Sequence, residues 1–273
     1  MNERTRESIA DLRRTLLAAG APAPEAMLRA LERDPRRGAR ELSASIRKRQ
    51  QAGLREQRRL DRLMLFESEL WAAGIRLIAG VDEAGVAPLA GPVVAAAVIL
   101  PRRYRLPGLD DSKKIVDERR RLMLAERIQK DAVAWSVGQA EVDEIDRLNI
   151  YHAGLLAMRR AVETLVVEPE FLLIDARTLP HCTIPQRGIV HGDALSASIA
   201  AASILAKTTR DARMIELDRE YPGYGLASHK GYPTSQHLGA LKSRGPLPIH
   251  RRSFGPVRAA LSGEPLQGEL FRR

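Results

Sequence analysis

Four carboxylates in this 273-residue chain stand where predicted strands end or glycine turns begin. Asp82 and Glu83 close the run RLIAGVDE, Asp175 closes EFLLID, and Asp193 follows a glycine. Loops at strand ends are where α/β proteins place functional side chains. Hard cations such as Mg²⁺ and Mn²⁺ take oxygen ligands, and phosphoryl-transfer sites often hold two of them about 3.5 to 4 Å apart. Each acid alone is more often a helix cap, a turn former or a surface charge, and spacing alone does not show that the four converge.

Composition narrows the classes of metal site and partner. The single cysteine, Cys182, excludes an intramolecular disulfide and a cysteine-based zinc site. A formal net charge of +10 favours a polyanionic partner, because Lys and Arg displace counterions from phosphates, although general solubility also explains such a charge. The longest apolar run, Val93 to Leu100, is far shorter than the roughly 20 residues of a membrane helix, and the first residues lack a signal-peptide pattern. We therefore expect a cytoplasmic protein that does not enter the membrane.

The elements that must position the acids divide the chain into three parts. Residues 1–75, rich in Arg, Ala, Leu and Glu, predict an all-helical N-terminal extension with helices at 3–19, 24–32 and 41–72. Residues 76–260 predict an α/β domain with a mixed sheet flanked by helices, and residues 261–273 a tail. The predicted strands of the domain are 76–82, 92–100, 133–139, 170–175 and 188–191, and its predicted helices are 119–130, 149–166, 196–219 and 237–243.

One face of the long predicted helix in the extension is basic. Lys48, Arg55, Arg59 and Arg62 recur at intervals that place them on one side of a helix. A basic face of this kind is able to contact nucleic acid, but a solvated helix surface is the commoner explanation, and the sequence leaves both open.

Ordered motifs from Ala79 onward resemble the ribonuclease HII family. The opening segment is AGVDEAGVAPLAGPVVAAAVIL, and DSKK, LID, GD, SIAAASILAKTTRD, YPGYG, HKGY and HRRSF follow in the family's order. The resemblance spans about residues 76–257. The extension is similar to the helical arm of some bacterial members, which implies an accessory region that grips the duplex, with a structural role as the alternative.

The resemblance implies an RNase H-like fold and an endonuclease of the ribonuclease H type. Its substrates would be the RNA strand of RNA/DNA hybrids and ribonucleotides embedded in duplex DNA, cut to leave 3′-hydroxyl and 5′-phosphate ends. It also implies that Asp82, Glu83, Asp175 and Asp193 bind two divalent cations, Mn²⁺ or Mg²⁺. We expect a monomer whose partner is the hybrid or ribonucleotide-containing duplex.

The resemblance further implies residues that read the substrate. Lys113 matches a lysine that touches backbone phosphate, and Tyr232 matches a tyrosine packed against the sugar after the ribonucleotide. In isolation the first is typical of a solvated charge and the second of a loop anchor. His229, His250 and Arg251 also lie in matching motifs, and the sequence assigns them no role.

One loop and two single positions depart from the family pattern. The loop that normally reads Gly-Arg-Gly, and senses the 2′-hydroxyl of RNA through its backbone, is Gly85-Val86-Ala87 here. Val86 removes an arginine that reaches phosphate, and Ala87 is expected to restrict the backbone. His191 and Leu195 replace lysines. We expect an active ribonuclease with weakened or broadened recognition of single ribonucleotides; the alternatives are a weakly active or inactive hybrid-binding paralogue and an RNase H-like DNA nuclease or resolvase.

Overall fold

The chain forms two compact units, residues 1–61 and residues 62–273, in a computed structural model that describes residues 8–18 and 22–263. The sequence predicts the boundary at residue 75, which is later in the chain than this division by contacts. The difference arises because Phe66, Leu70 and Trp71 pack against a core cluster of the second unit, so that the helix carrying them belongs to that unit.

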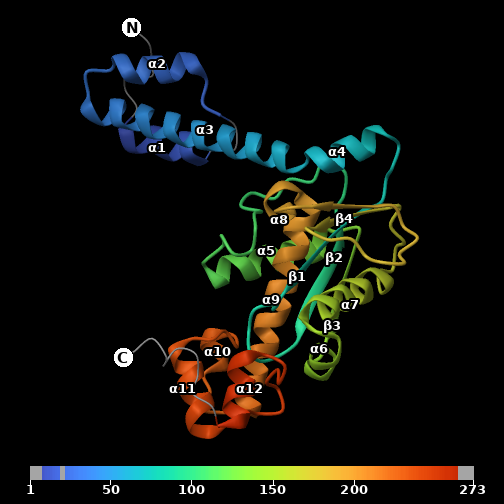
Figure 1. Ribbon diagram of the computed structural model, residues 1–273. Helices are drawn as coiled ribbons and strands as arrows, with labels where there is room; N and C mark the ends of the chain where they lie inside the picture. The colour runs from blue at the N-terminus through green and yellow to red at the C-terminus, as the bar shows by residue number, and fades with distance from the viewer. Residues whose placement is uncertain (1–7, 19–21, 264–273) are drawn as a thin grey trace. The chain divides into compact units, whose positions relative to one another are not determined.

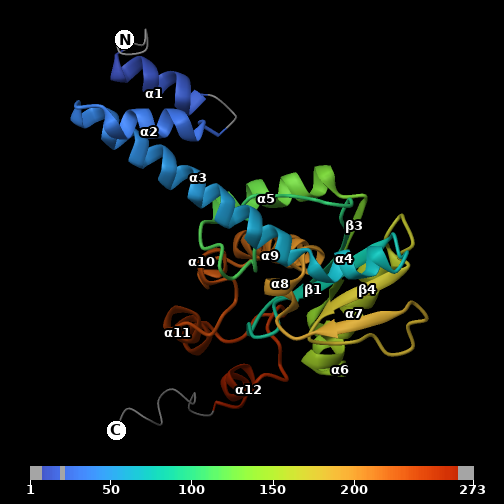
Figure 2. The same cartoon turned by 90° about the horizontal axis from the view of Figure 1, so that it is seen from above.

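Helices alone make up the described part of the first unit. The helices of the N-terminal region are α1 (Ile9–Ala18), α2 (Glu25–Arg33), α3 (Arg37–Leu63), which runs past the boundary, and α4 (Leu65–Ala72) of the second unit. Arg47 joins α3 to α2 through ion pairs with Glu25 (2.9 Å) and Glu32 (2.6 Å), and the two helices lie side by side in Figure 2. The single helix predicted over 41–72 is interrupted at Met64, whose backbone (φ −95°, ψ 11°) leaves the helical region.

A five-stranded mixed sheet forms the centre of the second unit, in the order β3-β2-β1-β4-β5 (Figure 1). Its strands are β1 (Ile78–Ala84), β2 (Val93–Ile99), β3 (Ala134–Ala140), β4 (Phe171–Asp175) and β5 (Gln186–Ile189). β2 pairs antiparallel with β1 and β3, whereas β4 pairs parallel with β1 and β5. The predicted mixed sheet is therefore confirmed, with β5 beginning two residues earlier than expected.

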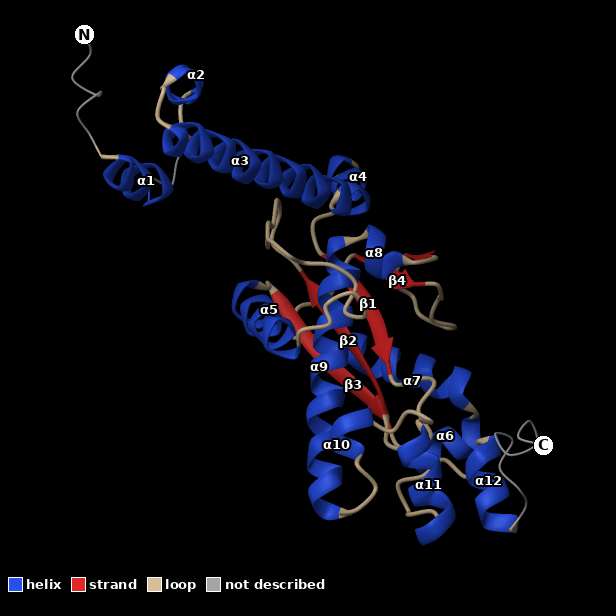
Figure 3. Ribbon diagram, turned by 90° about the vertical axis from the view of Figure 1, so that its left-hand side faces the viewer, coloured by secondary structure: helices blue, strands red, loops and turns tan. Residues whose placement is uncertain are grey.

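Two long helices cover the two faces of the sheet. α9 (Ala197–Glu220) packs on β1 and β2 from one side, and α7 (Ile150–Glu163) packs on β3 and β2 from the other (Figure 3). All of β2, VVAAAVI, is therefore buried. Gly80 sets the distance on the α9 side, because a Cβ there would lie 2.0 Å from the carbonyl carbon of Ser198.

Six further helices of the second unit follow β2 in the described residues. They are α5 (Glu118–Asp131), α6 (Val142–Leu148), α8 (Gly192–Leu195), α10 (Leu226–His229), α11 (Ser235–Arg244) and α12 (Gly255–Ser262). The predicted helices 119–130, 149–166, 196–219 and 237–243 correspond to α5, α7, α9 and α11; α6, α8, α10 and α12 are too short to show a clear helical period. None of the helices in the described ranges is both long enough and apolar enough to cross a bilayer.

Candidate active site

The register of two parallel strands brings the predicted acids to one place. Val81 of β1 lies opposite Ile174 of β4, so the residues that follow them, Asp82 and Asp175, are neighbours. Oδ1 of Asp175 accepts a hydrogen bond of 2.7 Å from the N–H of Gly192, which holds the start of α8 against the end of β4. Asp193 follows directly, and Glu83 extends the set along β1.

Burial and mutual repulsion make this acidic cluster unfavourable by itself. Asp82 and Asp193 are 3% and 5% exposed. Burial, with a contribution from the charge of Glu83, raises the pKa of Asp82 well above its ordinary value, against a hydrogen bond from the hydroxyl of Ser203. Burial also raises the pKa of Glu83, and burial together with the charge of Asp193 raises the pKa of Asp175.

Two cations offset part of this negative charge. Arg177 Nη2 lies 3.0 Å from Oε1 of Glu83, and Lys113 Nζ lies 3.2 Å from Oδ2 of Asp193. Burial acts to lower the pKa of Lys113, but the hydrogen bond with Asp193 and the charges of Asp193, Asp82 and Asp111 together outweigh burial, and the pKa is raised. Lys113 was expected here from its motif; Arg177 was not, because an arginine after a strand gives no sequence signal of its own.

The donor set suits hard divalent ions. Oε2 of Glu83 is buried and finds no hydrogen-bond partner among the described residues, which leaves one carboxylate oxygen available to a cation. In residues 8–18 and 22–263, no three carboxylate, imidazole or thiol groups already stand at the spacing of a bound ion, and two of the four acids contact Arg177 and Lys113. Buried oxygen ligands that repel one another fit Mg²⁺ or Mn²⁺.

Two serines link the Lys113 loop to the acids. The hydroxyls of Ser112 and Ser203 are 2.9 Å apart, and both side chains are buried. Because the Ser203 hydroxyl donates to Asp82, the Ser112 hydroxyl must donate to Ser203. This pair fixes the loop on which Lys113 stands, and sequence reasoning did not identify it because serines in a small-residue helix are usually packing residues.

Buried arginines hold the loop that follows β1. Arg251 and Arg210 are 0% and 1% exposed. Arg251 donates hydrogen bonds of 2.6 to 3.0 Å to the carbonyls of Gly85, Val86, Pro88 and Gly91. Arg210 donates to the carbonyls of Ala90 and Pro92 at 3.0 Å. The two arginines thus fix the loop backbone from its buried side. This gives Arg251 a structural role that its motif alone did not reveal.

The three loop positions differ in what their backbone requires. Gly85 has φ +96°, and a Cβ there would lie 2.0 Å from Nε of Arg210, so only glycine fits. Ala87 is exposed and its φ is not positive. Ala87 therefore does not occupy a backbone conformation that requires glycine, and the loop differs from Gly-Arg-Gly chiefly by the side chain of Val86.

Left-handed backbone flanks two of the acids. Ala176, directly after Asp175, has φ +50°, and His191, two residues before Asp193, has φ +58°. Non-glycine residues in this region store strain that is common at functional sites. His191 and Leu195, which replace lysines of the family pattern, are both exposed.

Tyr232 presents an accessible ring from a fixed backbone. The residue is 40% exposed, and Lys207 Nζ lies 5.9 Å from the ring centroid. Its N–H donates to the carbonyl of His229 at 2.9 Å, and its carbonyl accepts from the N–H of Thr234 at 2.8 Å.

Comparison with known proteins decides the family. The family model described as Ribonuclease HII matches residues 79–257, and the model described as Ribonuclease HII N-terminal domain matches residues 8–71. The chain belongs to the ribonuclease HII family. It is 62% identical over 270 residues to Ribonuclease HII of Myxococcus xanthus (strain DK1622), covering 97% of this chain and 92% of that protein. Ribonuclease HII proteins are ribonuclease H-type endonucleases that cut RNA strands, and this chain is an enzyme of that type.

Solved structures of the ribonuclease HII family share the fold. Ribonuclease H2 from Pyrococcus horikoshii OT3 matches with a TM-score of 0.59 and 25% identity, covering 68% of this chain and 97% of that one. RNase HII from Archaeoglobus fulgidus, solved in a complex with PCNA, matches with a TM-score of 0.57 and 25% identity, covering 66% and 95%. The predicted RNase H-like fold is therefore confirmed.

Proposed function

We propose that this chain hydrolyses the RNA strand of RNA/DNA hybrids and also cuts at single ribonucleotides embedded in duplex DNA, leaving 3′-hydroxyl and 5′-phosphate ends. The observation that carries the proposal is the meeting of Asp82 and Asp175 at the ends of two parallel strands, with α8 and Asp193 bonded to the same edge. Partly buried carboxylates beside two cations suit phosphodiester hydrolysis.

Asp82, Glu83, Asp175 and Asp193 would hold two divalent ions, Mn²⁺ or Mg²⁺. Such ions, when bound, lower the pKa of a water nucleophile and stabilise the leaving oxygen. Glu83 offers a buried Oε2 that accepts no hydrogen bond from any described residue, and Lys113 at Asp193 supplies a mobile positive charge for a backbone phosphate. Lys113 is able to leave the carboxylate because its side chain is 74% exposed.

Gly85, Val86 and Ala87 would read the ribose from one side and Tyr232 from the other. The 2′-hydroxyl is what distinguishes RNA from DNA at a given nucleotide. The carbonyls of Gly85 and Val86 are taken by Arg251, so this loop meets the substrate in one conformation without an arginine of its own. The exposed ring of Tyr232 offers an apolar face to the following sugar.

The basic face of α3 would add further contacts to the duplex. Lys48, Arg55 and Arg62 are exposed, whereas Arg59 is half-buried and paired with Glu56 at 2.8 Å. Exposed cations of this kind add affinity that falls as salt rises.

A weakly active hybrid-binding paralogue is the second candidate, because Val86 removes the loop arginine. An assay with Mg²⁺ or Mn²⁺ and three duplexes, holding one ribonucleotide, a run of four, or none, separates the candidates. We expect cutting of the two ribonucleotide-containing duplexes only. Binding without cutting would favour the paralogue, and cutting of all three would indicate a DNA nuclease.

We also propose a protein partner by analogy with the Archaeoglobus fulgidus relative, which forms a complex with PCNA. The segment after α12 reads EPLQGELFRR, in which Leu270 and Phe271 are an adjacent apolar pair; it lies outside the described residues. Aromatic and aliphatic anchors in short peptides bind apolar pockets of partners. Calorimetry of the full chain and of a Leu270→Ala, Phe271→Ala variant against the host's counterpart of PCNA tests this, and equal binding by both proteins would contradict it.

A further inference from the structure

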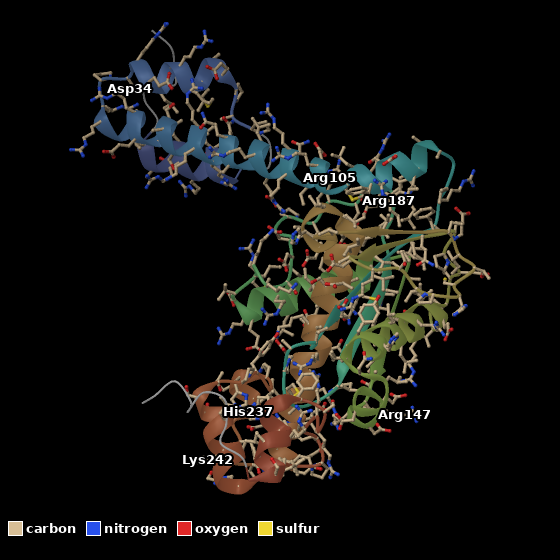
Figure 4. All side chains as sticks on the ribbon, in the orientation of Figure 1. Asp34, Arg105, Arg147, Arg187, His237 and Lys242 are labelled. Carbon is tan, nitrogen blue, oxygen red and sulfur yellow. The ribbon has the colours of Figure 1, made fainter. Side chains whose placement is uncertain are left out.

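Two buried histidines form a hydrogen-bonded chain that ends on the backbone of Tyr232. His237 and His250 are both 0% exposed, and His237 lies among α10, α11 and α12 (Figure 4). Their Nε2 atoms are 3.0 Å apart. Nδ1 of His237 lies 3.0 Å from the carbonyl oxygen of Tyr232, and Nδ1 of His250 lies 2.9 Å from the backbone nitrogen of Leu247. The proposed chemistry involves neither ring.

The partners at the two ends fix which ring nitrogen carries each proton. The N–H of Leu247 is a donor, so Nδ1 of His250 accepts and the proton of His250 is on Nε2. The carbonyl of Tyr232 is an acceptor, so Nδ1 of His237 carries the proton and its Nε2 accepts from His250. Both rings are then neutral. Burial supports this state, since it lowers the pKa of His237 and lowers that of His250 to about 4.

A third histidine holds the other side of the same residue. The ring of His229 stacks on that of His237, with centroids 4.5 Å apart and planes at 17°. The carbonyl of His229 accepts from the N–H of Tyr232. Nε2 of His229 donates to the carbonyl of Tyr224 at 2.8 Å, because its Nδ1 accepts from the N–H of Gly231. Tyr232 is therefore held at both its N–H and its carbonyl.

We propose that His237 is a positioning residue for Tyr232, and that His250 supports it by donating a hydrogen bond to Nε2 of His237. With its carbonyl held, Tyr232 presents its exposed ring in one direction, so less ordering is required when a duplex binds. Loss of the bond would affect KM more than kcat, because neither histidine touches the reacting phosphate. The inference rests on the proposed role of Tyr232 at the substrate sugar.

The tautomers are measurable without any substrate. In the full-length protein labelled with ¹⁵N-histidine, ring nitrogen–proton correlation spectra should show His237 protonated at Nδ1 and His250 at Nε2. His250→Leu removes the donor to Nε2 of His237, and the proton of His237 should stay on Nδ1, because the Tyr232 carbonyl remains its acceptor. A wild-type His237 protonated at Nε2 would overturn the inference whatever the enzyme cuts.

Kinetics then test whether the chain acts through Tyr232. On a duplex with one ribonucleotide, we expect His237→Leu to raise KM about tenfold with kcat changed less than about twofold. His237→Asn keeps a side-chain nitrogen able to donate to the Tyr232 carbonyl, and should raise KM less than about threefold. In a Tyr232→Ala background, His237→Leu should change KM by less than about twofold, since the residue it positions is gone.

Three results contradict this account in different ways. An equal rise in KM from His237→Leu in both backgrounds, or no rise in either, would show that His237 does not act through Tyr232. If His237→Leu does not fold, as judged by thermal unfolding, His250→Gln and His250→Leu replace it, because only the glutamine keeps a donor toward His237. A Tyr232→Ala protein that cuts as wild type would overturn the proposed role of Tyr232, and would leave the tautomers seen by NMR unchanged.

Discussion

Arg177 pairs with Glu83 through only one of its carboxylate oxygens, as far as the described residues show. Nη2 of Arg177 is 3.0 Å from Oε1, while Oε2 is buried without a hydrogen-bond partner in the part of the chain that the structure describes. The guanidinium carbon lies 5.0 Å from the centroid of the Tyr151 ring. Gly154 makes room for the group, since a Cβ there would lie 2.6 Å from Nη1. The arginine is thus a built-in counterion at a proposed metal ligand.

Removing that counterion should tighten metal binding. We expect Arg177→Met to lower the Kd of the protein alone for Mn²⁺ about tenfold, because a positive charge that repels the ion is lost. Arg177→Lys, which keeps the charge, should stay within about threefold of wild type. Isothermal titration calorimetry of the metal-free protein measures both. Arg187→Met, which removes an arginine that pairs with the exposed Glu69 (Figure 4), is the matched control. Weaker binding in Arg177→Met would mean that orientation of Glu83 outweighs repulsion.

Neutralising a buried acid should stabilise the metal-free protein. The pKa of Asp82 is raised in the folded state, so folded protein holds a proton that the unfolded chain has lost between about pH 4 and the raised pKa. Stability therefore falls as pH rises through that window. We expect Asp82→Asn to raise the free energy of unfolding by more than about 1 kcal/mol at pH 8, and by much less below about pH 4. Urea unfolding at both pH values checks this, and an equal change at both would contradict it.

Restoring the missing loop arginine should improve recognition of a single ribonucleotide. Val86 is half-buried, and Arg251 holds its carbonyl. A charge-assisted phosphate contact is worth about 1 to 3 kcal/mol, so Val86→Arg should raise kcat/KM about tenfold on one ribonucleotide and less on a run of four, which offers several registers. Ala87→Gly should add little, because φ at this position is not positive. An equal gain on both duplexes would mean that this loop does not limit recognition.

Truncation should separate binding from folding. Residues 62–273 keep α4 and its buried Glu67, whose Oε1 accepts hydrogen bonds of 2.6 to 2.9 Å from Ser196 and Ser198 at the start of α9. We expect this fragment to fold and cut, but to bind duplex more weakly and with a shallower dependence on salt. Deletion through residue 70 also removes Glu67 and should cost at least about 3 kcal/mol of stability. If the slope of log affinity against log salt concentration is unchanged, the first unit has a structural role instead.

Sequence reasoning found the sheet because strands such as PVVAAAVIL are nearly continuous apolar runs, as buried strands require. It found the four acids through a family motif, since spacing alone could not show that β1 and β4 lie side by side. It did not show that Phe66 and Trp71 pack against the core of the second unit, because α3 and α4 share a helical pattern and this packing depends on tertiary contacts.

The buried residues that support the site could not be identified from the sequence alone. Arg210, Arg251 and His237 are charged or polar types that are usually exposed, and their burial becomes visible only when the loop carbonyls and the Tyr232 carbonyl are in place. Ala87 shows the opposite case. The glycine of the family pattern suggested a positive φ at this position, but φ of Ala87 is not positive.

The central claim is that these carboxylates bind the ions that cut the RNA strand, and Asp175→Asn tests it most directly. The substitution removes a ligand charge but leaves the basic surface, so cleavage of an RNA/DNA hybrid in saturating Mn²⁺ should fall by at least about a thousandfold while hybrid affinity stays within about threefold. Asp143→Asn, which alters an exposed acid on α6, should cut as wild type. Cleavage by Asp175→Asn at a near-normal rate would show that the site lies elsewhere.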